Sequence, residues 1–422
     1  MSEEKLVPKL RFSGFDDEWK SFKLSEISER ITRKNKSLET DRPLTISAQY
    51  GLVDQIEYFN KIVASKSLKG YYLLNKGEFA YNKSYSNGYP FGAIKRLDDY
   101  ENGAISTLYI CFNANDKMNS DLLKEYFETD KWYKEIYKIA VEGARNHGLF
   151  NVAVGDFFNT KHVLPINNHE QEKIAKFLIE INTKIDLLEN KHKAYHDFKK
   201  YLMQNIFSQK LRFADSDSCW KEISLKDIGT FYRGHSYNST NVADEGLLVL
   251  RSNNIQGNVL DFSEDGLQFV DKDCKKELEL QKNDIVICMS NGTRRLVGKS
   301  AEYTGNYENK VTVGAFCSIF RTENKLAKYL FQTESYKKNL YLILAGTNIN
   351  NLKNSDLEKF KFNIPTNESE INKIHDLFVS IDNKIDYNKK QLEEITLFKK
   401  GLLQQMFVVQ LILSLLQNKK HI

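Results

Sequence analysis

Two long amphipathic helices are the clearest feature in the pattern of apolar and polar positions. Between residues 166 and 208 the apolar side chains recur in steps of mostly four and three, and the pattern returns between residues 366 and 407. The apolar positions are 174, 178, 181, 185, 188, 195, 198, 202 and 206, and then 374, 378, 381, 385, 392, 395, 398, 402 and 406. A period near 3.5 over more than four heptads, with Lys and Glu in between, is typical of a coiled coil. The pattern therefore predicts two coiled-coil helices.

These helices end the two halves of an internal repeat. The segment Lys9-Leu10-Arg11-Phe12 returns as Lys210-Leu211-Arg212-Phe213, about 200 residues later. Further matched pairs are Trp19 and Trp220, Pro165 and Pro365, Glu170 and Glu370, Lys184 and Lys384, and Phe198 and Phe398. A common spacing that holds from one end of the unit to the other indicates a duplication. The chain is therefore predicted to be two units of about half its length.

The direction of the helices follows from their connection. The first helix leads directly into the second unit, because Lys210 follows Phe207 by only a few residues. If the second helix lies beside the first, it must run back. We therefore expect an antiparallel pair between two globular domains, a dumbbell with an approximate two-fold axis. The alternative is that each helix packs separately on its own domain.

The segments that precede the helices share one plan. Residues 1–165 and 209–365 each contain short runs rich in β-forming residues, followed by an amphipathic pattern that starts near Asp121 or Leu326. The expected fold class is thus mixed α/β (α+β), with two similar globular domains at 1–165 and 209–365. The helices occupy 166–208 and 366–407, and residues 408–422 form a C-terminal extension, which we interpret as continuing the helix.

Composition narrows the class of protein only slightly. The chain is 41% hydrophobic and 28% charged, which is typical of a folded globular protein. A net charge of +5 on 422 residues does not by itself indicate a nucleic-acid partner. The start is polar, and no apolar run approaches the roughly 20 residues that span a bilayer, so we expect a cytoplasmic protein without membrane contact. The five cysteines form no CxxC pair, which argues against structural zinc and disulfides.

Candidate binding residues gather around two Ser-Asn-Gly turns, at residues 86–88 and 290–292. Arg and Lys can neutralise phosphates, Arg and Asn can contact base edges, and Tyr can stack or bind phosphate. A further polar loop follows the downstream helix of each unit, and its alternative interpretation is a helix cap and turn. The alternative for the two turns is an ordinary solvated hairpin. The candidate DNA-binding residues are Lys83, Tyr85, Asn87, Tyr89, Lys95, Arg96, Arg145, Asn146, Asn291, Thr293, Arg294, Arg295, Lys299 and Asn348.

Signatures of catalysis are missing from the sequence. The segment from Gly292 to Ser300 resembles a P-loop, but five residues separate its glycines where the motif has four. No GxGxxG follows a predicted strand, and no HExxH occurs. His192 and His196 lie four residues apart, but they lack further ligands and are expected on the helix surface. We therefore predict no catalytic residues and no metal site.

The helical repeats resemble those of the specificity subunit of type I restriction-modification systems. The resemblance rests on Glu170 through Gln204, on Glu370 through Gln404, and on the Lys-Leu-Arg-Phe segment that begins each unit. It implies that each globular part is a target-recognition domain that reads one half of a bipartite double-stranded DNA sequence. It also implies that the paired helices set the spacing between the domains and bind two methyltransferase subunits, and through them the restriction subunits.

Cofactors are expected only on those partners. The resemblance implies that S-adenosylmethionine, ATP and magnesium bind to the methyltransferase and restriction subunits and that this chain binds none. The sequence departs from the family after Phe407, where an apolar run from Val408 to Leu416 replaces the expected polar residues. Two other classes stay open: a coiled-coil scaffold that does not bind DNA, and a stand-alone restriction or modification enzyme. The first would not need two basic turns, and the second would need catalytic motifs.

Overall fold

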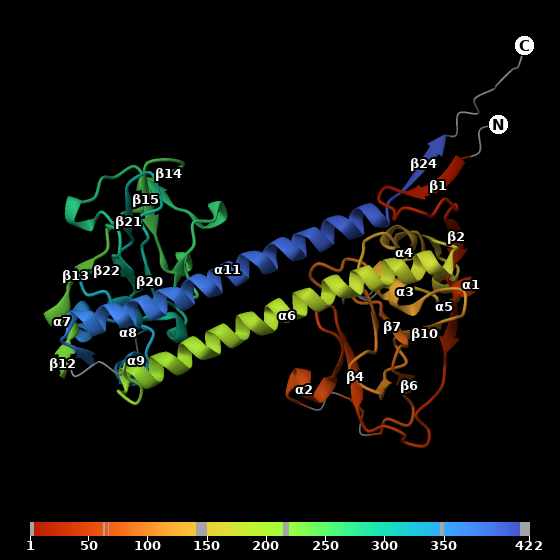
Figure 1. The fold of residues 1–422 in the computed structure, drawn as a ribbon, viewed down its shortest axis with the longest axis horizontal. Helices are drawn as coiled ribbons and strands as arrows, with labels where there is room; N and C mark the ends of the chain where they lie inside the picture. The colour runs from red at the N-terminus through yellow and green to blue at the C-terminus, as the bar shows by residue number, and fades with distance from the viewer. Residues whose placement is uncertain are drawn as a thin grey trace, which may run out of the picture. The chain divides into compact units, whose positions relative to one another are not determined.

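The chain divides into two compact units, each of which contains parts of both long helices. The computed structural model describes residues 4–61, 64–65, 67–140, 150–213, 219–346 and 350–413. Unit 1 comprises residues 1–189 and 390–422, and unit 2 comprises residues 190–389. The helix α6 (Asn168–Phe207) continues from unit 1 into unit 2, and α11 (Glu368–Met406) returns from unit 2 to unit 1 (Figure 1).

Unit 1 is built on two four-stranded sheets and several short helices. Its strands are β1 (Glu4–Pro8), β2 (Lys20–Lys23), β3 (Ser28–Ile31), β4 (Pro43–Ser47), β5 (Gly51–Asp54), β6 (Tyr72–Asn75), β7 (Phe79–Asn82), β8 (Ala93–Arg96), β9 (Asn102–Ile105), β10 (Ile110–Ala114) and β11 (Lys161–Leu164). Its short helices are α1 (Leu24–Ile27), α2 (Gln55–Phe59), α3 (Ser120–Phe127), α4 (Tyr133–Ile139) and α5 (Val154–Phe158). The sheet orders are β3-β10-β7-β8, which is antiparallel, and β5-β4-β9-β6, in which β4 and β9 are parallel.

Unit 2 repeats this plan with more irregular connections. Its strands are β12 (Trp220–Ser224), β13 (Thr230–Arg233), β14 (Val242–Ala243), β15 (Leu247–Leu250), β16 (Ile255–Gln256), β17 (Val259–Leu260), β18 (Phe269–Val270), β19 (Ile285–Cys288), β20 (Ser300–Glu302), β21 (Val311–Val313), β22 (Cys317–Arg321) and β23 (Lys361–Pro365). Its short helices are α7 (Leu225–Ile228), α8 (Ala327–Leu330), α9 (Glu334–Ala345) and α10 (Asn354–Leu357), with five 3-10 turns, η1 (Ser239–Asn241), η2 (Ser252–Asn254), η3 (Glu264–Gly266), η4 (Lys276–Leu278) and η5 (Arg294–Leu296).

One four-stranded sheet corresponds strand by strand between the two units, and the other shares its parallel pair. The order β13-β22-β19-β20 matches β3-β10-β7-β8, and the parallel pair β15 and β21 matches β4 and β9. In both units a two-stranded ribbon, β2 with β11 or β12 with β23, leads into the long helix. The predicted fold class, two similar mixed α/β segments alternating with two long helices, is confirmed.

An acidic residue fixes the same turn in both units. Glu78 accepts a hydrogen bond from the backbone of Asn75 and pairs with Arg33. Asp284 likewise accepts from the backbone of Gln281 and pairs with Arg321 at 2.6 Å. Each carboxylate therefore closes the turn before the central strand β7 or β19 and ties it to a neighbouring strand or loop.

The long helices pack antiparallel within each unit. In unit 1 the start of α6 and the end of α11 share one apolar core, and in unit 2 the end of α6 meets the start of α11. The buried residues are Ile174, Leu178, Ile181, Leu403 and Met406 in unit 1 and Leu202, Met203, Ile206, Ile374, Phe378 and Ile381 in unit 2. The antiparallel arrangement was predicted from connectivity and is confirmed.

The predicted seam is wrong at one matched pair of positions. Phe198 and Phe398 are 50% and 53% exposed. The following residues, Lys199 and Lys399, turn inward instead, because each forms an ion pair with a carboxylate of its own unit. His192, which was expected on the surface, is half-buried and lies 3.1 Å from the amide oxygen of the buried Asn388.

A buried carboxylate near the start of each long helix contacts an arginine and a tryptophan from the beginning of the same repeat. Glu170 accepts two hydrogen bonds from Arg11, at 2.7 and 2.8 Å, and one from the indole of Trp19. In unit 2, Glu370 accepts from Arg212 and from Trp220 in the same way. We call these contacts the carboxylate clasps. They attach the beginning of each repeat to the helix that ends it.

The C-terminal extension does not continue the helix in the part described. α11 ends at Met406, and β24 (Val409–Leu413) pairs antiparallel with β1, which lies beside it in Figure 1. The β-branched residues at 408, 409 and 412 favour extended backbone, and β1 supplies the hydrogen-bonding partners that this backbone needs. The prediction of a longer helix is therefore wrong for residues 409–413. None of the helices in the described ranges is long and apolar enough to cross a bilayer.

Candidate nucleic-acid interface

The first Ser-Asn-Gly turn is a tight turn that presents polar side chains. Ser86 and Tyr89 exchange backbone hydrogen bonds of 2.8 and 3.2 Å, and Gly88 has a φ of 81°, which only glycine adopts easily. Tyr85 is 59% exposed and Asn87 is also exposed, whereas Lys83 and Tyr89 are half-buried. Tyr85 and Asn87 are thus the residues of this turn that a ligand can reach.

Lys95 and Arg96 belong to the interior of unit 1 and not to this surface. Lys95 is buried and forms two hydrogen bonds, of 2.6 and 2.8 Å, with Glu128. Arg96 pairs with Asp98 and Asp121. Because carboxylates of the chain already neutralise both cations, we correct the prediction and remove them from the candidate interface. They are adjacent to the turn in sequence, but β8 directs them toward α3 and its neighbours.

The second Ser-Asn-Gly segment is not a glycine-dependent hairpin. Neither Asn291 nor Gly292 has a positive φ, and the chain enters the 3-10 turn η5 directly afterwards. The side chain of Asn291 organises the loop, since its oxygen accepts from the backbone of Thr293 at 2.9 Å and its amide donates to Ser252 at 3.0 Å. The expected tight turn is therefore wrong here, and side-chain hydrogen bonds take its place.

Asn350 joins the two polar loops of unit 2. Its side-chain oxygen accepts from Arg294 Nε at 3.2 Å, and its amide donates to the carbonyl of Gly292 at 3.1 Å. The loop around Arg294 and the loop after α9 thus form one surface. The sequence predicted a polar loop after the downstream helix of unit 2 but gave no reason to place that loop beside the second turn. In unit 1 the backbone of Phe150, on the corresponding side of the domain, donates to Lys83 at 3.0 Å.

Two further candidates, Lys299 and Arg295, differ in their exposure to solvent. Lys299 donates to the carbonyl of Ile255 at 2.8 Å and is half-buried, so it holds the β16 segment. Arg295 is exposed and lines a cleft of about 1240 Å³ within unit 2. Lys200 and Lys210 also line this cleft. Arg145, Asn146 and Asn348 lie outside the described residues.

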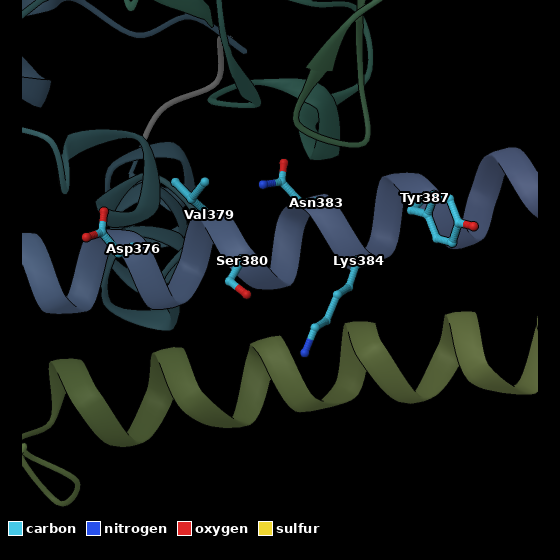
Figure 2. Close-up of a pocket in the computed structure, with 6 residues that line it drawn as sticks. All are labelled: Asp376, Val379, Ser380, Asn383, Lys384 and Tyr387. Carbon is cyan, nitrogen blue, oxygen red and sulfur yellow. The ribbon is translucent and has the colours of Figure 1, made fainter.

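A shallow groove follows one face of α11. Its volume is about 490 Å³, and its lining residues are Asp376, Val379, Ser380, Asn383, Lys384 and Tyr387. Figure 2 shows these side chains along the helix, with Lys384 directed toward α6. Tyr387 is largely exposed, and so is Leu187, the matching residue of α6. The described residues contain no group of three or more His, Cys, Asp or Glu side chains that could hold a metal ion.

Comparison with known proteins shows a similarity to one family over part of the chain. Residues 217–397 match the family model of the type I restriction modification DNA specificity domain. This match confirms the resemblance to type I specificity subunits that the helical repeats indicated.

The relatives cover different shares of the chain. The chain is 30% identical over 185 residues to the type I restriction enzyme StySPI specificity subunit of Salmonella potsdam, a match that covers 42% of this chain and 39% of that protein. The EcoKI specificity subunit of Escherichia coli strain K12 is 31% identical over 155 residues, which is 35% of this chain and 32% of that protein. These matches therefore span well under half of either relative. The MjaVIII specificity subunit of Methanocaldococcus jannaschii is 23% identical over 320 residues, 71% of this chain and 72% of that protein.

Two solved structures share the fold at low sequence identity. The S subunit of a type I restriction-modification system from M. genitalium has a TM-score of 0.59 at 16% identity, covering 95% of this chain and 99% of that one. A chain from a structure of the type I R-M system has a TM-score of 0.52 at 16% identity, covering 92% of this chain and 97% of that one. The fold is thus that of the solved S subunit.

Proposed function

We propose that this chain is the DNA-specificity subunit of a type I restriction-modification complex. Each globular domain reads one half of a bipartite double-stranded target, and the chain itself performs no catalysis. The observation that carries the proposal is the repetition of an exposed polar loop at the end of the central strand, after β7 in unit 1 and after β19 in unit 2, in a chain with a matching specificity domain.

The two loops offer different chemistry to DNA. The first presents Tyr85 and Asn87, which can stack or hydrogen-bond but carry no charge. The second presents Arg294, oriented by Asn350, and Arg295, which has no ion pair or hydrogen-bond partner among the described residues. An oriented guanidinium suits a base edge, whereas a freely moving one suits a phosphate. We therefore assign Arg294 to base readout and Arg295 to the backbone.

The long helices offer matched surfaces for two copies of one partner. Apolar residues that reach the surface recur at equivalent places of α6 and α11, namely the exposed Ile179 with the half-buried Val379, and the exposed pairs Leu187 with Tyr387 and Phe198 with Phe398. A duplicated surface suits two identical methyltransferase subunits, and restriction subunits would join through them in the full complex. S-adenosylmethionine, ATP and magnesium would then bind to those partner subunits and not to this chain.

The proposal is tested by selection from a random duplex library. The full chain, alone and with its methyltransferase subunit, would be incubated with the library, and the bound DNA would be sequenced. We expect enrichment of two short sequence elements separated by a spacer of constant length and random sequence. Enrichment of one uninterrupted element, or of none with the partner present, would contradict two independent readers.

Replacing Arg295 with Ala is expected to weaken binding to all duplex sequences similarly. Loss of one phosphate contact should flatten the slope of log K against log salt concentration by about 0.9. Fluorescence anisotropy at several salt concentrations measures both quantities. Lys361→Ala is the matched control, because this exposed cation already pairs with Glu222 on the ribbon β12–β23. An unchanged slope for Arg295→Ala would remove this residue from the interface.

A further inference from the structure

A buried ionic contact attaches the globular part of unit 1 to both long helices. Glu125 on α3 is only 1% exposed. Its carboxylate accepts a 2.7 Å hydrogen bond from the amide of Asn182 on α6 and lies 3.1 Å from the ammonium of Lys399 on α11. One negative and one positive charge are thus balanced where three elements meet.

Unit 2 has an equivalent ionic contact, but its carboxylate lies on a long helix and not on the globular part. The carboxylate is that of Asp382 on α11, 2.7 Å from the ammonium of Lys199 on α6. The globular part contributes Tyr329 on α8, whose buried hydroxyl donates to Asp382 at 3.1 Å. Lys199 also donates to Gln332 at 3.0 Å.

The repeat shows that these two contacts are equivalent. Lys199 and Lys399 occupy the same position of the repeat, and so do Asn182 and Asp382. Glu125 corresponds to Tyr329, because their spacing is the one that relates the buried Leu122 to Leu326 and Phe127 to Phe331. The lysine is therefore constant, while the carboxylate lies on the globular domain in unit 1 and on the helix in unit 2.

We propose that these residues form a positional key that matches each globular domain to the helix that follows it. If domain 1 were placed on the helix of unit 2, Glu125 and Asp382 would bring two carboxylates to one lysine. If domain 2 were placed on the helix of unit 1, Tyr329 and Asn182 would leave Lys399 with no carboxylate. Both arrangements bury an uncompensated charge, which destabilises a protein strongly.

The key defines which piece of the chain can be exchanged as a module. The domain residue and the helix residue that must agree both come from the same repeat, and the lysine of the other helix serves either combination. A domain can therefore move between the two positions together with the first half of its following helix. A globular domain moved alone would carry the wrong partner for position 182 or 382.

The proposal is tested by moving the carboxylate within unit 1 of the full chain. Glu125→Gln leaves Lys399 without a carboxylate, and Asn182→Asp adds a second one, so each single variant should lower the Tm by about 5–10 °C. The double variant Glu125→Gln with Asn182→Asp recreates the charge placement of unit 2 and should recover most of the loss. A double variant with the sum of the two losses would overturn the proposal. The readout is thermal unfolding, so this test is independent of the proposed DNA-binding function.

A chimera provides a second arm that does not depend on single substitutions. Residues 20–164 would be replaced by residues 221–364, which puts a second copy of domain 2 on the helix of unit 1. We expect this chimera to unfold at a lower temperature than the parent chain and to be stabilised by Asn182→Asp. In the parent chain the same substitution should destabilise. Destabilisation by Asn182→Asp in both backgrounds would show that no key exists.

Discussion

Replacing Glu170 with Gln is expected to lower the free energy of unfolding of unit 1 by about 3–5 kcal/mol. The carboxylate is 1% exposed and accepts hydrogen bonds from Arg11 and Trp19, which begin the first repeat. Glutamine keeps the size of the side chain but removes its charge, so the guanidinium of Arg11 would stay in a largely buried position without a counter-ion. The hydrogen bond with Glu170 is also the main reason that the pKa of Arg11 is raised above its usual value.

Urea unfolding followed by tryptophan fluorescence measures this loss, because Trp19 lies in the carboxylate clasp. Glu172→Gln is the matched control, since this neighbouring carboxylate is 68% exposed and should contribute little. Glu370→Gln should cost less than Glu170→Gln, because Arg212 is more exposed than Arg11 and its contacts with Glu370 are longer. A change below about 1 kcal/mol for Glu170→Gln would show that the clasp does not hold the repeat together.

Acidification is expected to lower the free energy of unfolding of unit 1 through His162, by about 3 kcal/mol in total. His162 is buried between Tyr126 and Thr160, with contacts of 3.1 Å at Nδ1 and 2.9 Å at Nε2. The hydroxyl of Thr160 already donates to the carbonyl of Phe157, so it accepts from Nε2, and Nδ1 accepts from Tyr126. The network therefore holds a neutral imidazole, and burial lowers the pKa of His162 from 6.5 to about 4.

The direction of the effect follows from proton uptake. Between pH 6.5 and about 4 the unfolded chain binds a proton on His162 that the folded chain does not, so the free energy of unfolding falls as pH falls through this window. Below about pH 4 both states are protonated and this contribution stops changing. Urea unfolding at pH 7 and pH 5 would compare wild type, His162→Gln and the control His169→Gln, which changes an exposed imidazole. The pH dependence should shrink only in His162→Gln, and an equal dependence in all three would refute the assignment.

The long helices were predictable because they rest on local periodicity, whereas the clasps were visible in the sequence only as matched residues. Apolar spacing alone located α6 and α11, and the recurrence of Arg11, Trp19 and Glu170 marked residues common to both repeats but did not show that they contact one another. The inward position of Lys199 and Lys399 was not predictable in this way. A heptad pattern favours Phe198 and Phe398 at the seam, and only the carboxylates supplied by the tertiary structure reverse that preference.

The location of the candidate interface was predictable from the sequence, but the side chains that form it were not. Both Ser-Asn-Gly segments follow a central strand, yet Lys95 pairs with Glu128 and Arg96 pairs with Asp121, which are distant in sequence, and Arg96 also pairs with the nearby Asp98. The second turn differs from the first because Asn291 and Asn350 form hydrogen bonds across the loop. Such pairings depend on how strands and loops meet in space, and no spacing in a single sequence records them.

The discontinuity of unit 1 sets an order of folding during synthesis. Unit 2 is one continuous segment and can complete its core once residue 389 has emerged, whereas unit 1 requires residues 390 and beyond. Until Met406 and Phe407 are made, the aromatic rings of Trp19 and Tyr126 lack neighbours that belong to their core. The N-terminal half of the protein is thus synthesised first, but its core is completed last. Its apolar surface stays exposed while the whole of unit 2 is translated.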